Sequence, residues 1–175
     1  IDITKPIDMH CIVYEIPLPE LHWYNWPSSR SRLVSNACHW IDYFLFLNSY
    51  ADIKEKYIWN PRGNDLSIQI KLINEAYLSF SLTDVGSIRL GVRDYIELRQ
   101  KGITVRMLDS SLYIAEDNNK IIRRKKINPL QSYSKMYREI SNKISRRENG
   151  DNLNSLLSSR LTLELETYNN KKSIN

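Results

Sequence analysis

The feature that most constrains the fold is a two-residue alternation of apolar and polar side chains between residues 66 and 82. Apolar residues occupy every second position from Leu66 to Leu72 and again from Ala76 to Leu82. This period is typical of strands that bury one face, and the short step between the two runs suits an antiparallel pair. Shorter runs predict further strands at 88–92 and 103–108, and a hairpin over 112–115 and 120–123. The chain is therefore expected to bury one face of an antiparallel sheet.

Two segments have the longer period of helices. Between residues 31 and 49, apolar side chains recur at steps of three and four and form one wide helix face. A second helix is predicted from Asn128, a favourable cap followed by proline in the first turn, to Asn149-Gly150. We therefore expect an α+β fold: an antiparallel β-sheet packed against a large helix in the N-terminal half and a C-terminal amphipathic helix.

The remaining segments are less regular. Residues 9–16 predict a strand, residues 18–27 an ordered aromatic loop, and residues 52–59 a short helix. Residues 153–157 fit a helical turn, whereas residues 161–166 also alternate as a strand would. Whether residues 161–166 pair within the domain or with a neighbouring copy stays open at this point.

Length and composition indicate one domain. The chain has 175 residues, of which 42% are hydrophobic and 26% charged, as in ordinary globular proteins. We expect a single globular domain over 1–168, with a basic C-terminal third over 118–175 and a polar tail over 169–175. The longest apolar stretch, 40–47, is too short to span a membrane, and the N-terminal residues do not resemble a signal peptide.

The charge is concentrated in that C-terminal third. Residues 1–117 contain 12 basic and 15 acidic residues, whereas residues 118–175 contain 13 basic and five acidic ones. A basic amphipathic helix of this kind can bind phosphates, anionic lipid headgroups or an acidic protein face, or it can be solvated. The side chains expected to form such an anionic-ligand surface are Arg123, Arg124, Lys125, Lys126, Lys135, Arg138, Lys143, Arg146 and Arg147.

No pattern in the sequence indicates catalysis. The two cysteines cannot form a disulfide scaffold and are expected to be free thiols, and the adjacent pairs His10-Cys11 and Cys38-His39 lack metal-ligand spacing. Asp65 followed by Gln69-Ile70-Lys71 resembles the core of a Mg²⁺-dependent nuclease superfamily, but the spacing is too short. None of the five glycines belongs to a nucleotide-binding loop. We therefore expect no catalytic residue, no metal and no cofactor, and a protein that is not an enzyme.

One stretch resembles a known family. Arg30-Ser31-Arg32 leads into an aromatic-rich helix that carries Cys38-His39-Trp40 and Tyr43, and antiparallel strands follow. This order resembles the globular domain of rhabdovirus matrix proteins, of the type found in plant and insect cytoplasmic rhabdoviruses. The resemblance is specific around residues 30–50.

The resemblance implies a viral structural protein. It would self-associate into a helical lattice, condense the nucleocapsid by binding the viral nucleoprotein, with RNA reached through the nucleocapsid, and link it to the anionic inner surface of the envelope membrane. It would be found in the virion, in the host cytoplasm and at the membrane periphery. Trp23, Tyr24 and Trp26 are the candidates for self-association, although they can equally cap the domain's own core. The alternative hypothesis is a basic nucleic-acid-binding or adaptor domain.

Overall fold

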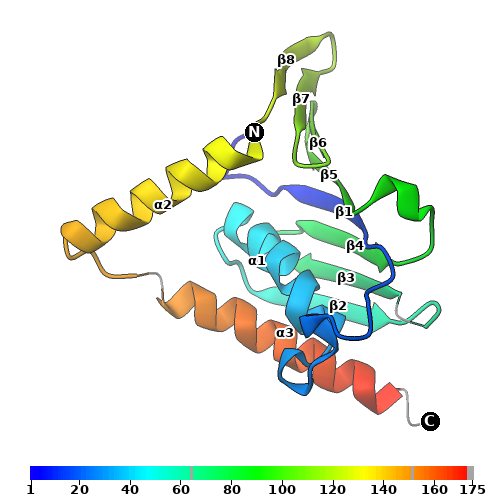
Figure 1. Cartoon of the computed structure of the whole chain (residues 1–175). Coiled ribbons are helices and arrows are strands. Elements are labelled where there is room, and N and C mark those ends of the chain that lie inside the picture. Colours follow the sequence, from blue (N-terminus) through cyan, green and yellow to red (C-terminus); the bar gives the residue numbers. More distant parts are fainter. Residues whose placement is uncertain (64, 151, 173–175) are drawn as a thin grey trace.

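An eight-stranded sheet forms the body of the protein in the computed structural model, which describes residues 1–63, 65–150 and 152–172 (Figure 1). The strands are β1 (Asp8–Tyr14), β2 (Ile53–Trp59), β3 (Leu66–Leu72), β4 (Tyr77–Thr83), β5 (Arg93–Gln100), β6 (Ile103–Leu108), β7 (Leu112–Asp117) and β8 (Ile121–Lys126). Their order across the sheet is β2-β3-β4-β1-β5-β6-β7-β8. The β1–β4 pair is parallel, whereas the other neighbouring pairs are antiparallel. The predicted α+β class with a mainly antiparallel sheet is confirmed.

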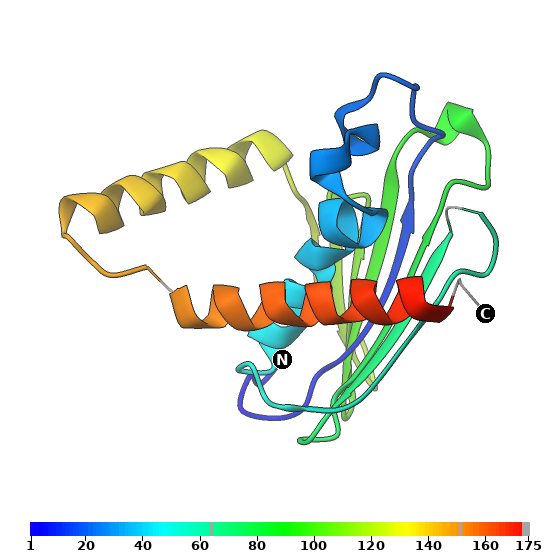
Figure 2. The same ribbon diagram turned by 90° about the horizontal axis from the view of Figure 1, so that it is seen from below.

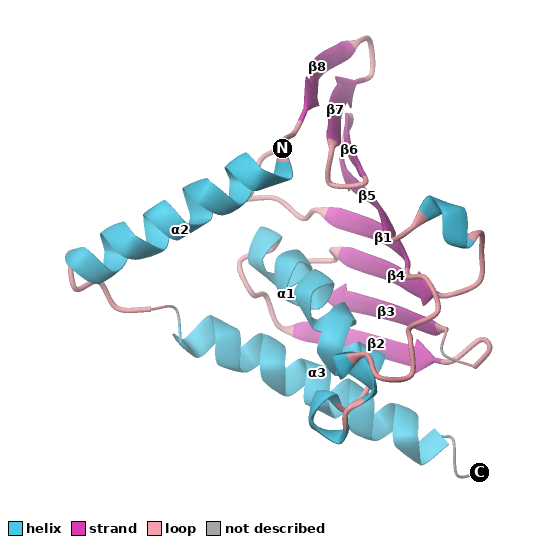
Figure 3. Cartoon of the chain, viewed as in Figure 1, coloured by secondary structure: helices cyan, strands magenta, loops and turns pink. Residues whose placement is uncertain are grey.

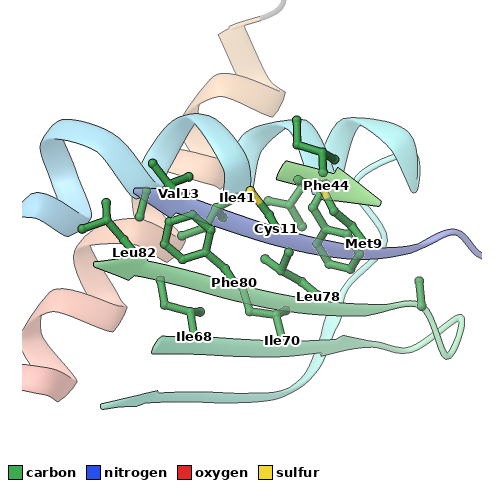
Figure 4. Packing of buried hydrophobic residues seen from close by; sticks show 14 of the residues in the cluster. Met9, Cys11, Val13, Ile41, Phe44, Ile68, Ile70, Leu78, Phe80 and Leu82 are labelled. Atoms are coloured by element: carbon green, nitrogen blue, oxygen red, sulfur yellow. The ribbon is translucent and has the colours of Figure 1, made fainter. Parts of the chain in front are cut away.

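The core lies between one face of this sheet and helix α1 (Cys38–Leu47). The alternation predicted for residues 66–82 is confirmed, because every second residue of β3 and β4 is buried. Figure 4 shows Ile41 and Phe44 of α1 facing the buried side chains of β1, β3 and β4, which include Met9 and Phe80. Burying such large side chains contributes about 1.5–3 kcal/mol each, so this layer dominates the stability of the fold.

All three α-helices lie on the same side of the sheet (Figure 2). Helix α3 (Asn152–Lys172) crosses α1 and reaches β2, and it buries Leu161 and Leu165 in the core. Helix α2 (Pro129–Ser145) extends away from the sheet (Figure 3).

The predicted C-terminal amphipathic helix is therefore present but is not packed on the sheet. Helix α2 begins as expected, because the Asn128 side chain accepts a hydrogen bond from the backbone N–H of Leu130 at 3.0 Å. Its described side chains are nevertheless exposed, and the C-terminal helix that packs on the core is α3.

Several local predictions are wrong. Residues 52–59 form strand β2, not a helix, because the backbone of this segment pairs with β3. The strand predicted at 88–92 is a 3₁₀ turn at Ile88–Leu90. Residues 161–166, for which the sequence left helix and strand open, are helical. Helix α3 continues to Lys172 through the first part of the expected polar tail, and residues 173–175 lie outside the described residues.

The cysteines behave as the sequence predicts. Both are free thiols, and burial raises the pKa of Cys11 and of Cys38 above the ordinary thiol value. Over the described ranges, no group of three or more His, Cys, Asp or Glu side chains is arranged to hold a metal ion. No helix within the described part of the chain has the length and apolar character to cross a membrane.

Candidate functional site

The parallel pair β1–β4 places two acidic residues side by side where both strands end. The backbone N–H of Glu15, the residue after β1, donates to the carbonyl of Thr83, the last residue of β4, at 3.0 Å. Asp84 follows directly. The carboxyl ends of adjacent parallel strands are where open sheets commonly bind ligands.

Arg32 joins these two carboxylates. Its Nη2 lies 2.6 Å from Glu15 Oε2, and its Nη1 lies 3.6 Å from Asp84 Oδ2. The other Glu15 oxygen accepts a hydrogen bond from the Asn36 amide. The Nε of Arg32 is buried and has no hydrogen-bond partner in the structure. Buried polar atoms are nearly always satisfied, so this one marks a place where a polar partner would fit.

The segment before α1 has an irregular backbone. It contains 3₁₀ turns at Trp23–Asn25 and Pro27–Ser29 and a π-helical turn at Leu33–Ala37. Between them, Arg30 has φ 58° and ψ −111°, a conformation that is costly for any residue except glycine. Backbone strain and π-helical turns both concentrate at functional sites.

Helix α3 holds this strained segment through Glu166. The buried Glu166 carboxylate accepts a hydrogen bond from Ser31 Oγ at 2.7 Å, and its Oε2 lies 2.6 Å from Arg30 Nη2. The segment is therefore tied to two distant parts of the chain, to β1 through Arg32 and to α3 through Arg30 and Ser31.

Arg30, Ser31, Arg32, Asp84 and Glu166 line a cleft of about 500 Å³, which we call the carboxyl-end cleft. Its polar walls are formed by Tyr24, Asn25, Arg30, Ser31, Arg32, Asn60, Asp84, Glu166 and Asn169. Guanidinium, amide and carboxylate groups offer planar arrays of donors and acceptors, and the Tyr24 ring offers an apolar surface beside them. Such a lining suits a ligand with several hydroxyl groups.

A second cavity of about 510 Å³ lies between α1 and α3 and shares Arg30 with the carboxyl-end cleft. We call it the helix-side cavity; it is lined by Arg30, Val34, Cys38, His39, Asp42, Ser155, Ser158, Ser159, Thr162 and Leu163. The exposed His39 is the one imidazole among the residues that line these two cavities. Histidine is the side chain best suited to transfer a proton near neutral pH.

The aromatic residues singled out from the sequence lie beside the cleft. The rings of Trp23 and Tyr24 meet edge to face with centroids 4.2 Å apart. Trp23 and Trp26 are exposed, whereas the half-buried Tyr24 lines the carboxyl-end cleft. Self-association through these three residues stays a prediction.

The predicted basic surface is elsewhere in the molecule. Arg123, Arg124, Lys125 and Lys126 lie on the edge strand β8, Lys135, Arg138 and Lys143 on α2, and Arg146 and Arg147 just after it. All nine are exposed, and none lines the carboxyl-end cleft. Their binding of an anionic ligand stays a prediction.

Sequence reasoning missed the residues of the carboxyl-end cleft. Asp84 and Glu166, which line it, and Glu15, which pairs with Arg32, come from distant parts of the chain and come together only in the fold. One usable signal was a carboxylate near the end of a predicted strand, because Glu15 is the second-last residue of the strand predicted at 9–16 and Asp84 lies two residues after the strand predicted at 76–82. Arg30 was noted for a family resemblance, and His39 for that resemblance and as a rejected metal ligand, because their neighbours in space were unknown.

Comparison with known proteins shows that the fold of this chain is similar to that of solved structures. No protein-family model and no curated protein matches the sequence. A solved UDP-N-acetylglucosamine 3-dehydrogenase from Acidithiobacillus ferrooxidans superposes with a TM-score of 0.74 at 9% identity, covering 95% of this chain and 55% of that one. A Gfo/Idh/MocA family oxidoreductase from Vibrio cholerae gives 0.72 at 9% identity, covering 96% and 54%. A 3-ketoreductase from Actinomadura kijaniata, solved with NADP and TDP-benzene, gives 0.70 at 11% identity, covering 94% and 55%.

These structures overturn the functional predictions. The identification as a rhabdovirus matrix protein is wrong, because the solved structures that share this fold are dehydrogenases and other oxidoreductases. The predicted structural role, the expectation that the chain is not an enzyme, the viral and membrane partners and the virion location are corrected with it. The alternative, a nucleic-acid-binding or adaptor domain, is not favoured either.

The resemblance had rested on the step from Arg30-Ser31-Arg32 into the helix that carries His39 and Trp40. A helix packed on an antiparallel sheet recurs in many α+β folds. At 9–14% identity, the likeness to oxidoreductases concerns the fold, and the chain spans about half the length of these proteins.

Proposed function

We propose that this chain is the substrate-binding part of an oxidoreductase that acts on a hydroxyl or keto group of a sugar-like molecule. The observation that carries the proposal is the carboxyl-end cleft, a polar hollow built on a fold that oxidoreductases share. Amide, carboxylate and guanidinium groups on its walls would hydrogen-bond the hydroxyls of such a substrate, and Tyr24 would cover one face of its ring.

The nicotinamide dinucleotide that this reaction class uses does not fit the chain itself. A dinucleotide site needs closely spaced glycines between a strand and the N-terminus of the next helix. Gly63 and Gly102 connect strands, Gly86 and Gly91 flank a 3₁₀ turn, and Gly150 lies between two helices, so no described glycine takes that position. The cofactor would be bound by another part of the enzyme, in keeping with the half of the related structures that this chain does not cover.

His39 would hold the proton that a hydroxyl gives up on oxidation, or supply it when a keto group is reduced. It lines the helix-side cavity, which adjoins the carboxyl-end cleft at Arg30. Glu15 and Arg32 would act as positioning residues, because their ion pair fixes the wall at the strand ends. Asp84 would accept hydrogen bonds from substrate hydroxyls.

Calorimetric titration of the chain with hexoses, NAD and NADP tests this proposal. We expect a hexose to bind and neither dinucleotide to do so, and Asp84→Asn to weaken hexose binding. In a protein that also carries the cofactor-binding part, His39→Asn should lower turnover by about 100-fold or more with hexose affinity unchanged. Binding of a dinucleotide without binding of any hexose would contradict the proposal.

A further inference from the structure

Arg30 combines three properties that a surface arginine rarely shows together. Its backbone has φ 58° and ψ −111°, its side chain is 52% exposed, and it lines both the carboxyl-end cleft and the helix-side cavity. A non-glycine residue in this backbone region persists only where the surrounding structure holds it there, and such residues cluster at ligand-binding sites.

The ion pair with Glu166 orients the Arg30 guanidinium but does not use all of its hydrogen-bond donors. Its Nη2 lies 2.6 Å from Glu166 Oε2, a buried oxygen for which the structure gives no partner of hydrogen-bond geometry. No hydrogen bond from the Arg30 side chain is found within the described ranges. The ion pair thus holds Nη2 against Glu166, whereas Nε and Nη1 of Arg30 have no hydrogen-bond acceptor among the described residues.

The acidic groups around Arg30 are already engaged. Glu15 is bonded to Arg32 and Asn36, Glu166 accepts from Ser31, and Asp84 lies nearest to Arg32. Glu166 also pairs with Arg30 itself, and Asp42 in the helix-side cavity accepts a hydrogen bond from the Tyr50 hydroxyl at 3.1 Å. Arg30 is the cationic residue that lines both cavities, and about half of its side chain is exposed there. A planar guanidinium with free N–H groups fits two oxygens of a phosphate or a carboxylate at once.

We propose that Arg30 is the specificity-determining residue of the site and binds an oxyanion carried by the substrate. This inference rests on the proposed function and narrows its substrate class to sugar-like molecules that bear a phosphate or carboxylate group. Arg30 then also orients the substrate, because the anionic end of the substrate is held at the junction of the two cavities and the substrate's hydroxyls extend into the carboxyl-end cleft.

The test compares ligand affinity with fold stability in Arg30→Gly. Glycine accepts the backbone conformation of residue 30 without strain, which offsets part of the cost of leaving the buried Glu166 carboxylate without its cationic partner. The melting temperature is measured alongside, to show that the variant is folded at the temperature of the titration. We expect the affinity for glucose 1-phosphate or for glucuronate, measured by titration calorimetry, to fall roughly tenfold or more, because a charged hydrogen-bonding partner is lost. The ligand whose affinity falls in Arg30→Gly identifies the anion that Arg30 binds. The affinity for neutral glucose should change little.

Arg62→Gly is the matched control. Arg62 is also an exposed loop arginine paired with a buried carboxylate, that of Asp65 at 3.5 Å, but it does not line either cavity. Arg62→Gly should keep wild-type affinity for both anionic sugars, and Arg30→Lys should retain part of it.

The outcomes separate the two proposals. Equal affinity of wild type and Arg30→Gly for both anionic sugars, with glucose still bound, overturns the role of Arg30 and leaves the proposed function standing. Arg30-dependent binding of glucose 1-phosphate in a protein that never transfers hydride, even with the cofactor-binding part, supports the anion site and overturns the oxidoreductase. Equal losses in Arg30→Gly and Arg62→Gly also overturn the role of Arg30.

Discussion

At the scale of single residues, Glu15 and Arg32 form an ion pair that holds Arg32, a residue lining the carboxyl-end cleft, against the end of β1. Their side chains are only 7% and 14% exposed. Pairing two nearly buried charges contributes little net stability, but removing one partner leaves the other desolvated and unpaired. The pair therefore acts mainly through geometry, because it joins the end of β1 to the segment that enters α1.

Glu15→Gln should lower the free energy of unfolding by about 3 kcal/mol, because Arg32 would lose its charged partner inside the protein. Urea denaturation followed by circular dichroism measures this difference. Glu20→Gln, at an exposed site of the aromatic loop, should leave stability unchanged. A loss of stability in Glu20→Gln equal to that in Glu15→Gln would show that the ion pair has no such role.

Glu75 gives the protein a pH dependence outside the site. Hydrogen bonds from Lys54 at 2.7 Å and from Lys71 at 2.6 Å lower the pKa of the Glu75 carboxyl from 4.5 to about 2. A carboxyl with a lowered folded-state pKa stabilises the protein fully above its unfolded pKa, and this contribution is lost as the pH falls from about 4.5 through about 2.

Glu75→Gln should therefore reduce the loss of stability between about pH 5 and about pH 2. The measurement is the melting temperature across this range. Glu139→Gln on α2 removes the same charge from an exposed helix and should leave the wild-type pH profile unchanged. An unchanged profile in Glu75→Gln would contradict the assignment.

At the scale of elements, β8 is an exposed edge strand that carries four consecutive basic residues, Arg123 to Lys126. Edge strands present unpaired backbone groups that can pair with another chain, and charged side chains discourage this. The basic run thus has a structural reason to be there, whether or not it also binds an anionic ligand.

The double variant Arg123→Thr/Lys125→Thr should self-associate with increasing concentration, because threonine favours strands and removes the repulsion. Sedimentation velocity detects this change. The double variant Lys135→Thr/Lys143→Thr has the same net charge but alters α2 and should sediment as wild type. Identical behaviour of the two double variants would contradict edge protection by β8.

The elements also show which parts of the fold are specified by the local sequence. Strands β3 and β4 could be predicted because alternation alone specifies their buried faces. Strand β2 could not, since Ile58 is its one buried residue, a register shift interrupts its pairing, and β3 supplies its hydrogen bonds. The site was out of reach for the same reason, because Glu15, Arg32 and Glu166 become neighbours only after β1, α1 and α3 have packed.

At the scale of the whole molecule, α3 links the C-terminal part of the chain to the core formed by the first half. Leu165 is fully buried, and Glu166 beside it holds the strained segment at Arg30 and Ser31. Helix α3 is therefore both a wall of the site and part of the hydrophobic core.

Leu165→Ala should lower the free energy of unfolding by about 3 kcal/mol, because it opens a cavity in the core. Leu156→Ala, on the exposed side of the same helix, should change it by less than about 0.5 kcal/mol. Thermal and urea denaturation give both values. Similar values for the two variants would mean that α3 does not pack as described.

The position of β1 has a consequence for how the protein is made. β1 is synthesised before the other strands of this sheet, and both of its neighbours, β4 and β5, leave the ribosome later. Until β4 and β5 emerge, β1 has no strand to pair with. The two halves of the sheet, β2-β3-β4 and β5-β6-β7-β8, can join only through β1. Closing such long loops is slow, so the two halves of the sheet should join only after β5 has been translated, and the nascent chain should depend on chaperones until then.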